Sequence, residues 1–294
     1  MNTEPAKIVR QARGGGTWFP AEPRALQRMV SGYIEEAAVP DVEGRIVAAI
    51  SPHAGYIYSG RVAGYTFRAI RDDMLRGHGP ETMVILGFSH RSAFRGVALM
   101  DGDAVGTPLG EAALDKEAGA VMIGKRTRLV FDHRPHADEH SAENQIPFAQ
   151  MAAPAARLVV ALIGEHHPET LSQLASALKD LSRIRKIVVL ASSDMLHDPD
   201  YDLVTRTDHE TLRKVEAMDD GAVLGDWSAH TQTFCGIMPV VTAMRFAAER
   251  GCRKGLVLHY RNSGDDYPES RGQWVVGYGA VAFSAPCAGD CAKR

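Results

Sequence analysis

The sequence predicts an α/β fold, a layered sandwich with a central, largely parallel or mixed sheet flanked by helices. Two observations support this class. Apolar runs of strand length recur along the chain and are nearly continuous in Val, Ile and Leu, which is typical of strands buried on both faces of a sheet. Stretches with helical periodicity lie between these runs, and strands that alternate with helices favour right-handed βαβ connections.

The first strand is expected at RIVAAIS, residues 45–51, and the second at TMVILGF, residues 82–88. A shorter run, GVALM at 96–100, ends at the turn signal Asp101-Gly102. The other predicted strands have the same apolar character and cover residues 157–163, 186–192, 255–260 and 274–283.

Helices are expected where apolar residues recur at helical spacing. The first opens with Pro23, which suits the first turn of a helix. Because no linker rich in Pro, Gly or Ser divides the chain, we expect one domain over 1–285 and a disordered tail over 286–294. The predicted helices cover residues 23–38, 61–75, 169–181, 201–218 and 237–251.

The composition indicates an ordinary globular protein. The 294 residues carry a formal net charge of -3, which gives no basic footprint for nucleic acid. The opening residues lack the apolar core of a signal peptide, and no stretch approaches the roughly 20 apolar residues that span a bilayer. Four cysteines are too few for a disulfide framework. We therefore expect a cytoplasmic protein that binds neither nucleic acid nor membrane.

Three histidines follow predicted strands. His53 comes two residues after 45–51, His90 two residues after 82–88, and His197 five residues after 186–192. Ligands of open α/β sheets bind beyond the carboxyl ends of the strands, so these imidazoles are expected to converge there. Three protein ligands with open positions are typical of a catalytic metal site, and imidazole suits iron, copper and zinc.

Two further segments offer catalytic groups. In DEHSAENQIPF, residues 138–148, His140 is a candidate general acid or base, with Glu143 as its partner or as a substrate anchor. The alternative is an ordinary helix start, because acidic residues favour that end of a helix. Nearby, His133 and His136 are expected to face solvent.

Cys235 precedes the helix expected at 237–251, and a cysteine at a helix N-terminus has a lowered thiol pKa. It is a candidate nucleophile or metal ligand, or simply a small buried thiol. Asp194, three residues before His197, is a candidate ligand or a residue that orients one.

Together, these segments resemble the Memo family, also called the B component of the AmmeMemoRadiSam system. The matching segments occur in the family's order and cover most of the chain: GTWFPAEP (16–23), SPHAGYIYSG (51–60), ILGFSHR (85–91), TPLGEAALD (107–115), DEHSAENQIPF (138–148), SSDMLHD (192–198) and FCGIMPV (234–240).

The resemblance implies a fold similar to that of LigB-type class III extradiol dioxygenases, which use non-haem Fe(II). By resemblance, His53, His90 and His197 match the family's metal site, and Asp194 and Cys235 match other residues of its pocket. The implied cofactor is a divalent metal, Fe(II) first, with copper or zinc as alternatives. LigB-type sites use two histidines and a glutamate, so a third histidine departs from that pattern.

Three functions remain open from the sequence. The first is a metal-dependent, dioxygenase-like oxidoreductase acting on a small organic or peptide substrate, with Tyr56, Tyr58 and Ser89 shaping the pocket. The second is a metal-independent hydrolase or transferase that uses Cys235 as nucleophile, His197 as base and Asp194 as the residue that orients the base. The third is a non-catalytic module that binds a peptide or protein in the same crevice. The family's name also implies a functional link to a radical-SAM protein and an AMMECR-type protein.

Overall fold

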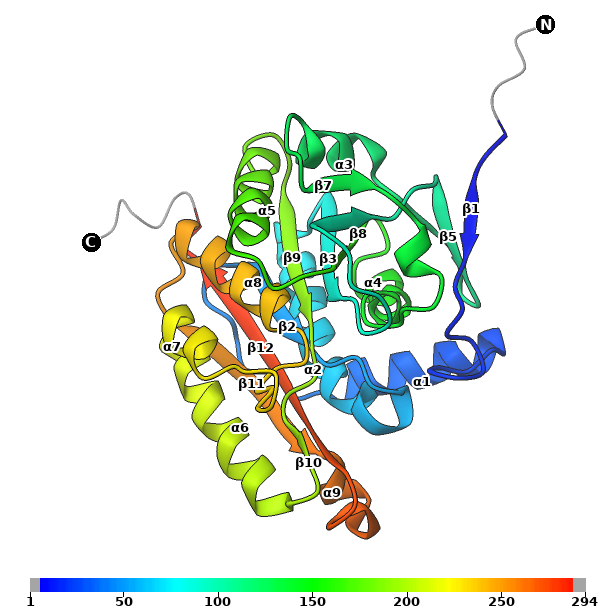
Figure 1. The fold of residues 1–294 in the computed structure, drawn as a ribbon. Coiled ribbons are helices and arrows are strands. Elements are labelled where there is room, and N and C mark those ends of the chain that lie inside the picture. Colours follow the sequence, from blue (N-terminus) through cyan, green and yellow to red (C-terminus); the bar gives the residue numbers. More distant parts are fainter. Residues whose placement is uncertain (1–5, 288–294) are drawn as a thin grey trace, which may run out of the picture.

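The computed structural model describes residues 6–287 and contains a nine-stranded mixed sheet at its centre (Figure 1). Its four middle strands run parallel in the order β2, β9, β3 and β8. They comprise Arg45–Ser51, Ile187–Ser192, Thr82–Phe88 and Arg157–Ile163. The predicted α/β class with a mixed sheet is therefore confirmed, and these strands match the predicted apolar runs closely.

Antiparallel strands complete both sides of the sheet. On one side, β12 pairs antiparallel with β2 and also with β11 and β10. On the other side, β4 pairs antiparallel with β8 and parallel with β7. Hydrophobic periodicity carries no information about direction, so the sequence did not distinguish these strands from parallel ones. Their bounds are Val275–Ala285 (β12), Gly255–Asn262 (β11), His197–Asp198 (β10), Val97–Leu99 (β4) and Leu129–Phe131 (β7).

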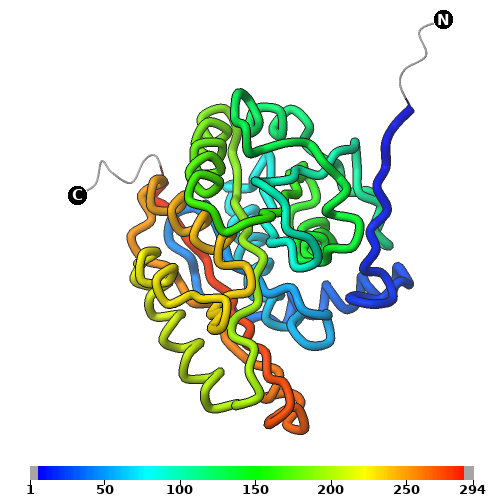
Figure 2. Tube along the Cα trace, in the orientation of Figure 1, coloured from blue at the N-terminus to red at the C-terminus, as the bar shows by residue number. Residues whose placement is uncertain are grey.

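A second, three-stranded sheet lies beside the main one and was not predicted. It consists of β1 (Val9–Gln11), β5 (Ala104–Thr107) and β6 (Gly110–Ala113). The trace in Figure 2 shows β1 (blue) at the margin of the molecule, far from β12 (red). These strands are short and only partly buried, so their apolar signal is weak.

Helices cover both faces of the main sheet. One face packs against α1, α2 and α4, and the other against α3, α5, α6, α7 and α8. The helices comprise Pro23–Glu36 (α1), Tyr56–Asp73 (α2), Lys116–Ile123 (α3), Ile146–Ala152 (α4), Pro168–Leu181 (α5), Tyr201–Glu216 (α6), Asp220–Gly225 (α7), Ile237–Glu249 (α8) and Ser263–Asp266 (α9). A π-helix at Met74–His78 and short 3₁₀ turns at Arg134–His136, Glu143–Gln145 and Pro268–Ser270 connect them.

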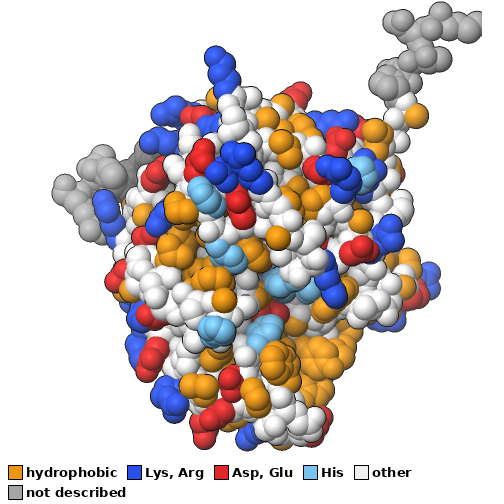
Figure 3. Space-filling model, viewed as in Figure 1, with side chains coloured by type: hydrophobic (Ala, Val, Ile, Leu, Met, Phe, Trp, Pro, Cys, Tyr) orange, Lys and Arg blue, Asp and Glu red, His pale blue; other side chains and the backbone are white. Residues whose placement is uncertain are grey.

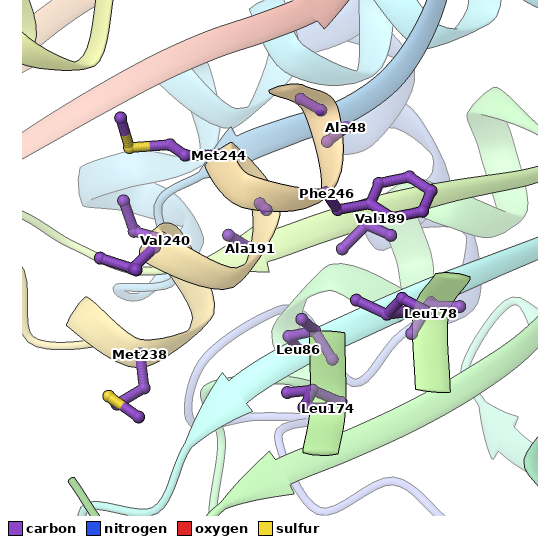
Figure 4. Close-up of a cluster of buried hydrophobic side chains, with 14 of the residues drawn as sticks. Ala48, Leu86, Leu174, Leu178, Val189, Ala191, Met238, Val240, Met244 and Phe246 are labelled. Atoms are coloured by element: carbon purple, nitrogen blue, oxygen red, sulfur yellow. The ribbon is translucent and has the colours of Figure 1, made fainter. Parts of the chain in front are cut away.

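The burial of β9 explains why its sequence is apolar throughout. Val189 and Ala191 contact the core beneath α5 and α8, which Figure 4 shows in close-up. Val188 and Leu190 belong to the core on the opposite face. Successive side chains of a strand point to opposite faces, so a strand covered on both sides needs an unbroken apolar run.

Helix α2 begins at Tyr56, five residues before the predicted start at residue 61. The predicted range therefore left out Gly60. In the structure Gly60 lies within the helix, where an added Cβ would come within 2.5 Å of the Tyr33 ring. The glycine therefore allows α1 to approach α2 closely.

Within residues 6–287, no helix is long and apolar enough to cross a membrane. Most of the tail predicted over 286–294 lies outside the described residues.

Candidate metal centre

The rings of His53, His90 and His140 meet beyond the carboxyl ends of β2 and β3. One ring nitrogen from each of them lies within 4.8 Å of the other two. The ring centroids form a nearly equilateral triangle with sides of 5.3, 5.3 and 5.5 Å. Several histidines (pale blue) are visible near the middle of this face in Figure 3. These three nitrogens can hold one metal ion between them.

The loop that carries His53 is fixed by Asp194, which lies two residues beyond β9. Its Oδ1 accepts hydrogen bonds from the backbone N–H groups of His53 (2.7 Å) and Ala54 (3.2 Å). Its other carboxylate oxygen lies 3.9 Å from His53 Nε2. Burial raises the pKa of Asp194, and the nearby His197 and these backbone donors oppose that rise. Asp194 thus positions His53 from a neighbouring strand.

The Ser192 hydroxyl determines which nitrogen of His53 carries the proton. Ser192 donates its only hydrogen to the carbonyl oxygen of Ser141. Its oxygen lies 3.1 Å from His53 Nδ1 and must therefore accept from that nitrogen. Nδ1 of His53 therefore carries a proton, and Nε2 is the ring nitrogen that a metal would bind.

His90 is held by a carboxylate, an arrangement that orients many metal-binding histidines. Glu139 accepts from the His90 backbone N–H (2.5 Å) and lies 3.0 Å from ring nitrogen Nδ1. Burial alone would lower the pKa of His90, but Cys235 and Glu139 raise it to about 10. Burial opposes ionisation of Glu139, yet hydrogen bonds from His90 and Ser141 bring its pKa well below the usual value. The remaining nitrogen, Nε2, is the one available to a metal.

His140 stacks on the indole of Trp18, with ring centroids 3.8 Å apart and planes within 1° of parallel. Its Nδ1 is buried and forms no hydrogen bond with any described residue, although a Glu139 oxygen lies 3.4 Å away. Burial and the neighbouring His53 lower the pKa of His140 to about 3. The ring is therefore neutral near pH 7, as a metal ligand must be.

Cys235 adds a sulfur to the cluster. Its Sγ lies 3.3 Å from His53 Nε2 and 3.6 Å from the hydroxyl of Ser193. Burial would raise the pKa of this thiol, but His53 and His90 lower it to about 6. The backbone N–H of Cys235 donates to the carbonyl oxygen of Asp194 (3.1 Å), so the sulfur is fixed by the same loop that positions His53.

A hollow of about 500 Å³ opens beside the cluster. Its lining residues include Trp18, Glu139 and His140 from the site described above. Glu143, predicted as a partner or substrate anchor, also lines it. The Glu143 carboxylate accepts from the backbone N–H groups of Arg13 and Gly14, at 2.7 Å each, and thereby attaches the N-terminal segment to the site.

His197, predicted as the third metal ligand, is not part of the three-nitrogen cluster. It lies in β10, paired with Val276 of β12, and its ring meets Trp274 edge-on at 6.1 Å. Its Nε2 is buried and has no hydrogen-bond partner among the described residues. A metal role for His197 stays a prediction, whereas His140, predicted as an acid or base, occupies the third position.

The predicted pocket residues are neighbours of His53 or His90 in the chain, but they differ in exposure. Tyr56 is buried, and its hydroxyl donates to the carbonyl oxygen of Asn144 (2.7 Å). Tyr58 is exposed and packs edge-on against Tyr267. Ser89 is buried, 3.3 Å from the hydroxyl of Ser92. Their part in binding a substrate stays a prediction.

His133 is exposed, as predicted, but the prediction that His136 faces solvent is wrong. His136 is buried, with Nε2 at 3.1 Å from the carbonyl oxygen of Ala98. The short 3₁₀ turn at Arg134–His136 directs this side chain inward, and no periodic pattern announces such a turn.

The donor set fits a metal ion. Nδ1 of His53 and of His90 is held by an oxygen of Ser192 or Glu139, and Nε2 of His53 contacts only the Cys235 sulfur as a hydrogen-bond partner within residues 6–287. The third, His140, is held by stacking and has a buried nitrogen with no partner among the described residues. Imidazoles fixed in this way suit iron, copper or zinc.

The fold and the site define a mixed α/β protein with a three-histidine cluster at the carboxyl edge of its parallel strands. The family model described as Memo-like protein matches residues 10–282, and the chain belongs to this family.

Similar proteins occur in archaea. A MEMO1 family protein of Methanopyrus kandleri is 30% identical over 289 residues, covering 94% of this chain and 99% of that protein. MEMO1 family proteins of Aeropyrum pernix and Archaeoglobus fulgidus are each 32% identical, and cover 93% and 94% of this chain and 99% of their own length. The similarity therefore extends over nearly the full length of this chain and of each of these relatives.

Proposed function

We propose that this protein is a metal-dependent oxidoreductase acting on a small organic substrate. The observation that supports it is the convergence of one nitrogen each from His53, His90 and His140. A bound iron or copper ion would supply Lewis acidity and electron transfer. The predicted cytoplasmic location and the link to radical-SAM and AMMECR-type proteins are part of this proposal.

The chain's own residues have distinct tasks in this proposal. Ser192 and Glu139 hold Nδ1 of His53 and of His90, so that Nε2 of each would be the nitrogen that binds the metal. Asp194 holds the His53 loop, and the Trp18 indole covers one face of His140. These groups fix the donor geometry before a ligand arrives, so little reorganisation accompanies binding.

The test is metal content, measured by elemental mass spectrometry on anaerobically purified protein after Fe(II) or Cu(II) loading. We expect near-stoichiometric metal in the wild type and loss of metal in His53→Ala and His140→Ala variants. His133→Ala, an exposed histidine outside the cluster, is the matched control. Retention of metal by His140→Ala but not by His197→Ala would instead restore the ligand set predicted from the sequence.

A thiol enzyme is the second candidate, supported by the low pKa of Cys235 and by the 3.3 Å contact of its sulfur with His53 Nε2. The structure places His53, rather than the predicted His197, beside this thiol. This candidate expects rapid alkylation of Cys235 by iodoacetamide at pH 7, unaffected by chelator, with buried Cys252 as the control. Protection of Cys235 by added metal supports the metal enzyme instead.

A protein with neither metal nor a reactive thiol would be the non-catalytic binding module. This conclusion requires that neither bound metal nor rapid alkylation of Cys235 is detected, in protein whose fold is shown to be intact by circular dichroism. The three candidates therefore give different pairs of results.

A further inference from the structure

We propose that Arg13 and Arg91 bind the carboxylate of the substrate, so that the site accepts a small organic acid. This inference rests on the proposed function, because it takes the hollow beside the histidine cluster as the substrate site. Both arginines line that hollow together with His140. Arg91 follows His90 directly in the chain, whereas Arg13 comes from the N-terminal segment that Glu143 holds in place.

The two guanidinium groups are available to a ligand. Within residues 6–287, neither forms a hydrogen bond or an ion pair through its side chain, and both residues are exposed. Other arginines, such as Arg126 and Arg128, are paired with carboxylates. A planar guanidinium that is not paired within the protein suits bidentate binding of a carboxylate.

Two carboxylates of the same wall are already engaged. Glu139 accepts from His90 and from the Ser141 backbone, and Glu143 accepts from two backbone N–H groups. They therefore do not compensate the arginines by direct pairing. Glu143 holds the backbone of Arg13, and it forms no ion pair with the guanidinium of that residue.

The carboxylates that line the hollow favour a monoanionic ligand over a dianionic one. Three acidic residues line it beside the two arginines, namely Asp138, Glu139 and Glu143. A phosphate monoester, which carries more negative charge at neutral pH, would be repelled more strongly by these carboxylates than a carboxylate would. The structure thus points to a carboxylic acid.

A neighbouring hollow offers apolar surface to the rest of the substrate. A second hollow of about 320 Å³ shares Arg13, Ala137 and Glu143 with the first. Val9, Met100 and Val105 contribute apolar surface to it. An acid with an apolar body can therefore pair its carboxylate with the arginines while burying that body beside them.

Binding of benzoate tests the proposal, measured by isothermal titration calorimetry with metal-loaded and metal-free protein. We expect benzoate to bind the wild type, and its affinity to fall at least about tenfold in Arg13→Gln and in Arg91→Gln, as expected when a charge-assisted hydrogen bond is lost. Arg95→Gln is the matched control, because Arg95 belongs to the same loop as Arg91 but does not line the hollow. Benzamide should bind at least about tenfold more weakly than benzoate.

Three results would overturn the inference: no benzoate binding to the wild type, equal affinity in the arginine variants, or tighter binding of phenyl phosphate than of benzoate. The metal assay separates this failure from failure of the proposed function. If the protein takes up no metal but binds benzoate in a way that depends on the arginines, the acid site is supported and the oxidoreductase proposal is contradicted. Stoichiometric metal together with benzoate binding that does not depend on the arginines would contradict the acid site and leave the proposed oxidoreductase supported.

Discussion

The Ser192 hydroxyl accepts a hydrogen bond from Nδ1 of His53 over 3.1 Å, because its own hydrogen is donated to the carbonyl oxygen of Ser141. Gln145 donates to the same oxygen over 2.8 Å. One hydroxyl at the end of β9 thus fixes the protonation pattern of a histidine that follows β2. Such contacts behind a metal ligand typically change metal affinity by about 10- to 100-fold.

We therefore expect Ser192→Ala to weaken metal binding about 10- to 100-fold, because the tautomer of His53 is no longer selected. The matched control is Ser51→Ala. Ser51 pairs in register with Ser192, is equally buried, and its hydroxyl has no hydrogen-bond partner within residues 6–287. Competition titration with a chromophoric chelator measures both variants. Equal losses in the two would contradict the assigned role of Ser192.

Metal binding should release a proton from His90. The pKa of His90, raised to about 10, means that the ring is protonated in the metal-free protein near pH 7. A metal must displace that proton, so affinity should fall about tenfold for each unit by which pH decreases below 10. Calorimetry in two buffers of different ionisation enthalpy counts the released protons. Glu139→Gln removes a carboxylate that holds the proton and should reduce the count near pH 7.

Asp208 should make stability depend on pH. Burial raises its pKa to about 7, and its carboxylate accepts from Leu196 N–H and the Tyr260 hydroxyl. Because the folded pKa exceeds the unfolded one, this group's contribution to stability is complete below about pH 4. It is lost as pH rises towards 7, by about 1.4 kcal/mol per unit.

Asp208→Asn abolishes this dependence. The free energy of unfolding of the variant, relative to that of the wild type, should therefore increase from pH 4 to pH 7. Urea unfolding at several pH values measures the difference. Asp202→Asn, at an exposed position of the same helix α6, should give a curve parallel to the wild type. A parallel curve for Asp208→Asn would show that Asp208 is not the responsible group.

Gly277 tolerates no side chain. An added Cβ would lie 1.7 Å from Oδ2 of Asp208, and the backbone of Gly277 exchanges hydrogen bonds with Met195 and Leu196. Gly277→Ala should therefore destabilise the protein by about 1–3 kcal/mol. Gly32→Ala, in helix α1 with nothing within 4 Å of the new methyl group, should stabilise it by about 1 kcal/mol. Thermal unfolding compares the two, and a neutral Gly277→Ala would refute the clash.

The positions of His53 and His90 were predictable because β2 and β3 are parallel and end at the same edge of the sheet. His140 was not predictable as their partner. It follows no strand of the central four, and the loop after β7 brings it back to that edge. The chain after β9 instead carries His197 into an antiparallel pairing with β12. The sequence did not predict this pairing, because an apolar run does not show which strands pair or in which direction.

The roles of Trp18 and Ser192 were also hidden in the sequence. Trp18 reaches His140 across more than a hundred residues, and the assignment of Ser192 depends on which carbonyl oxygen accepts its hydrogen. Such details depend on tertiary contacts rather than on local patterns. The crowding of acidic residues and a histidine in DEHSAENQ was the one signal that pointed to this loop.

Because Trp18 stacks on His140, its fluorescence can report a metal ion bound at the cluster. An indole 3.8 Å from a metal-binding ring would lose its fluorescence to an iron or copper ion bound there. Trp227 and Trp274 instead contact His166 and His197. Emission from Trp18 would therefore report occupancy of the site in the native chain, without an added label.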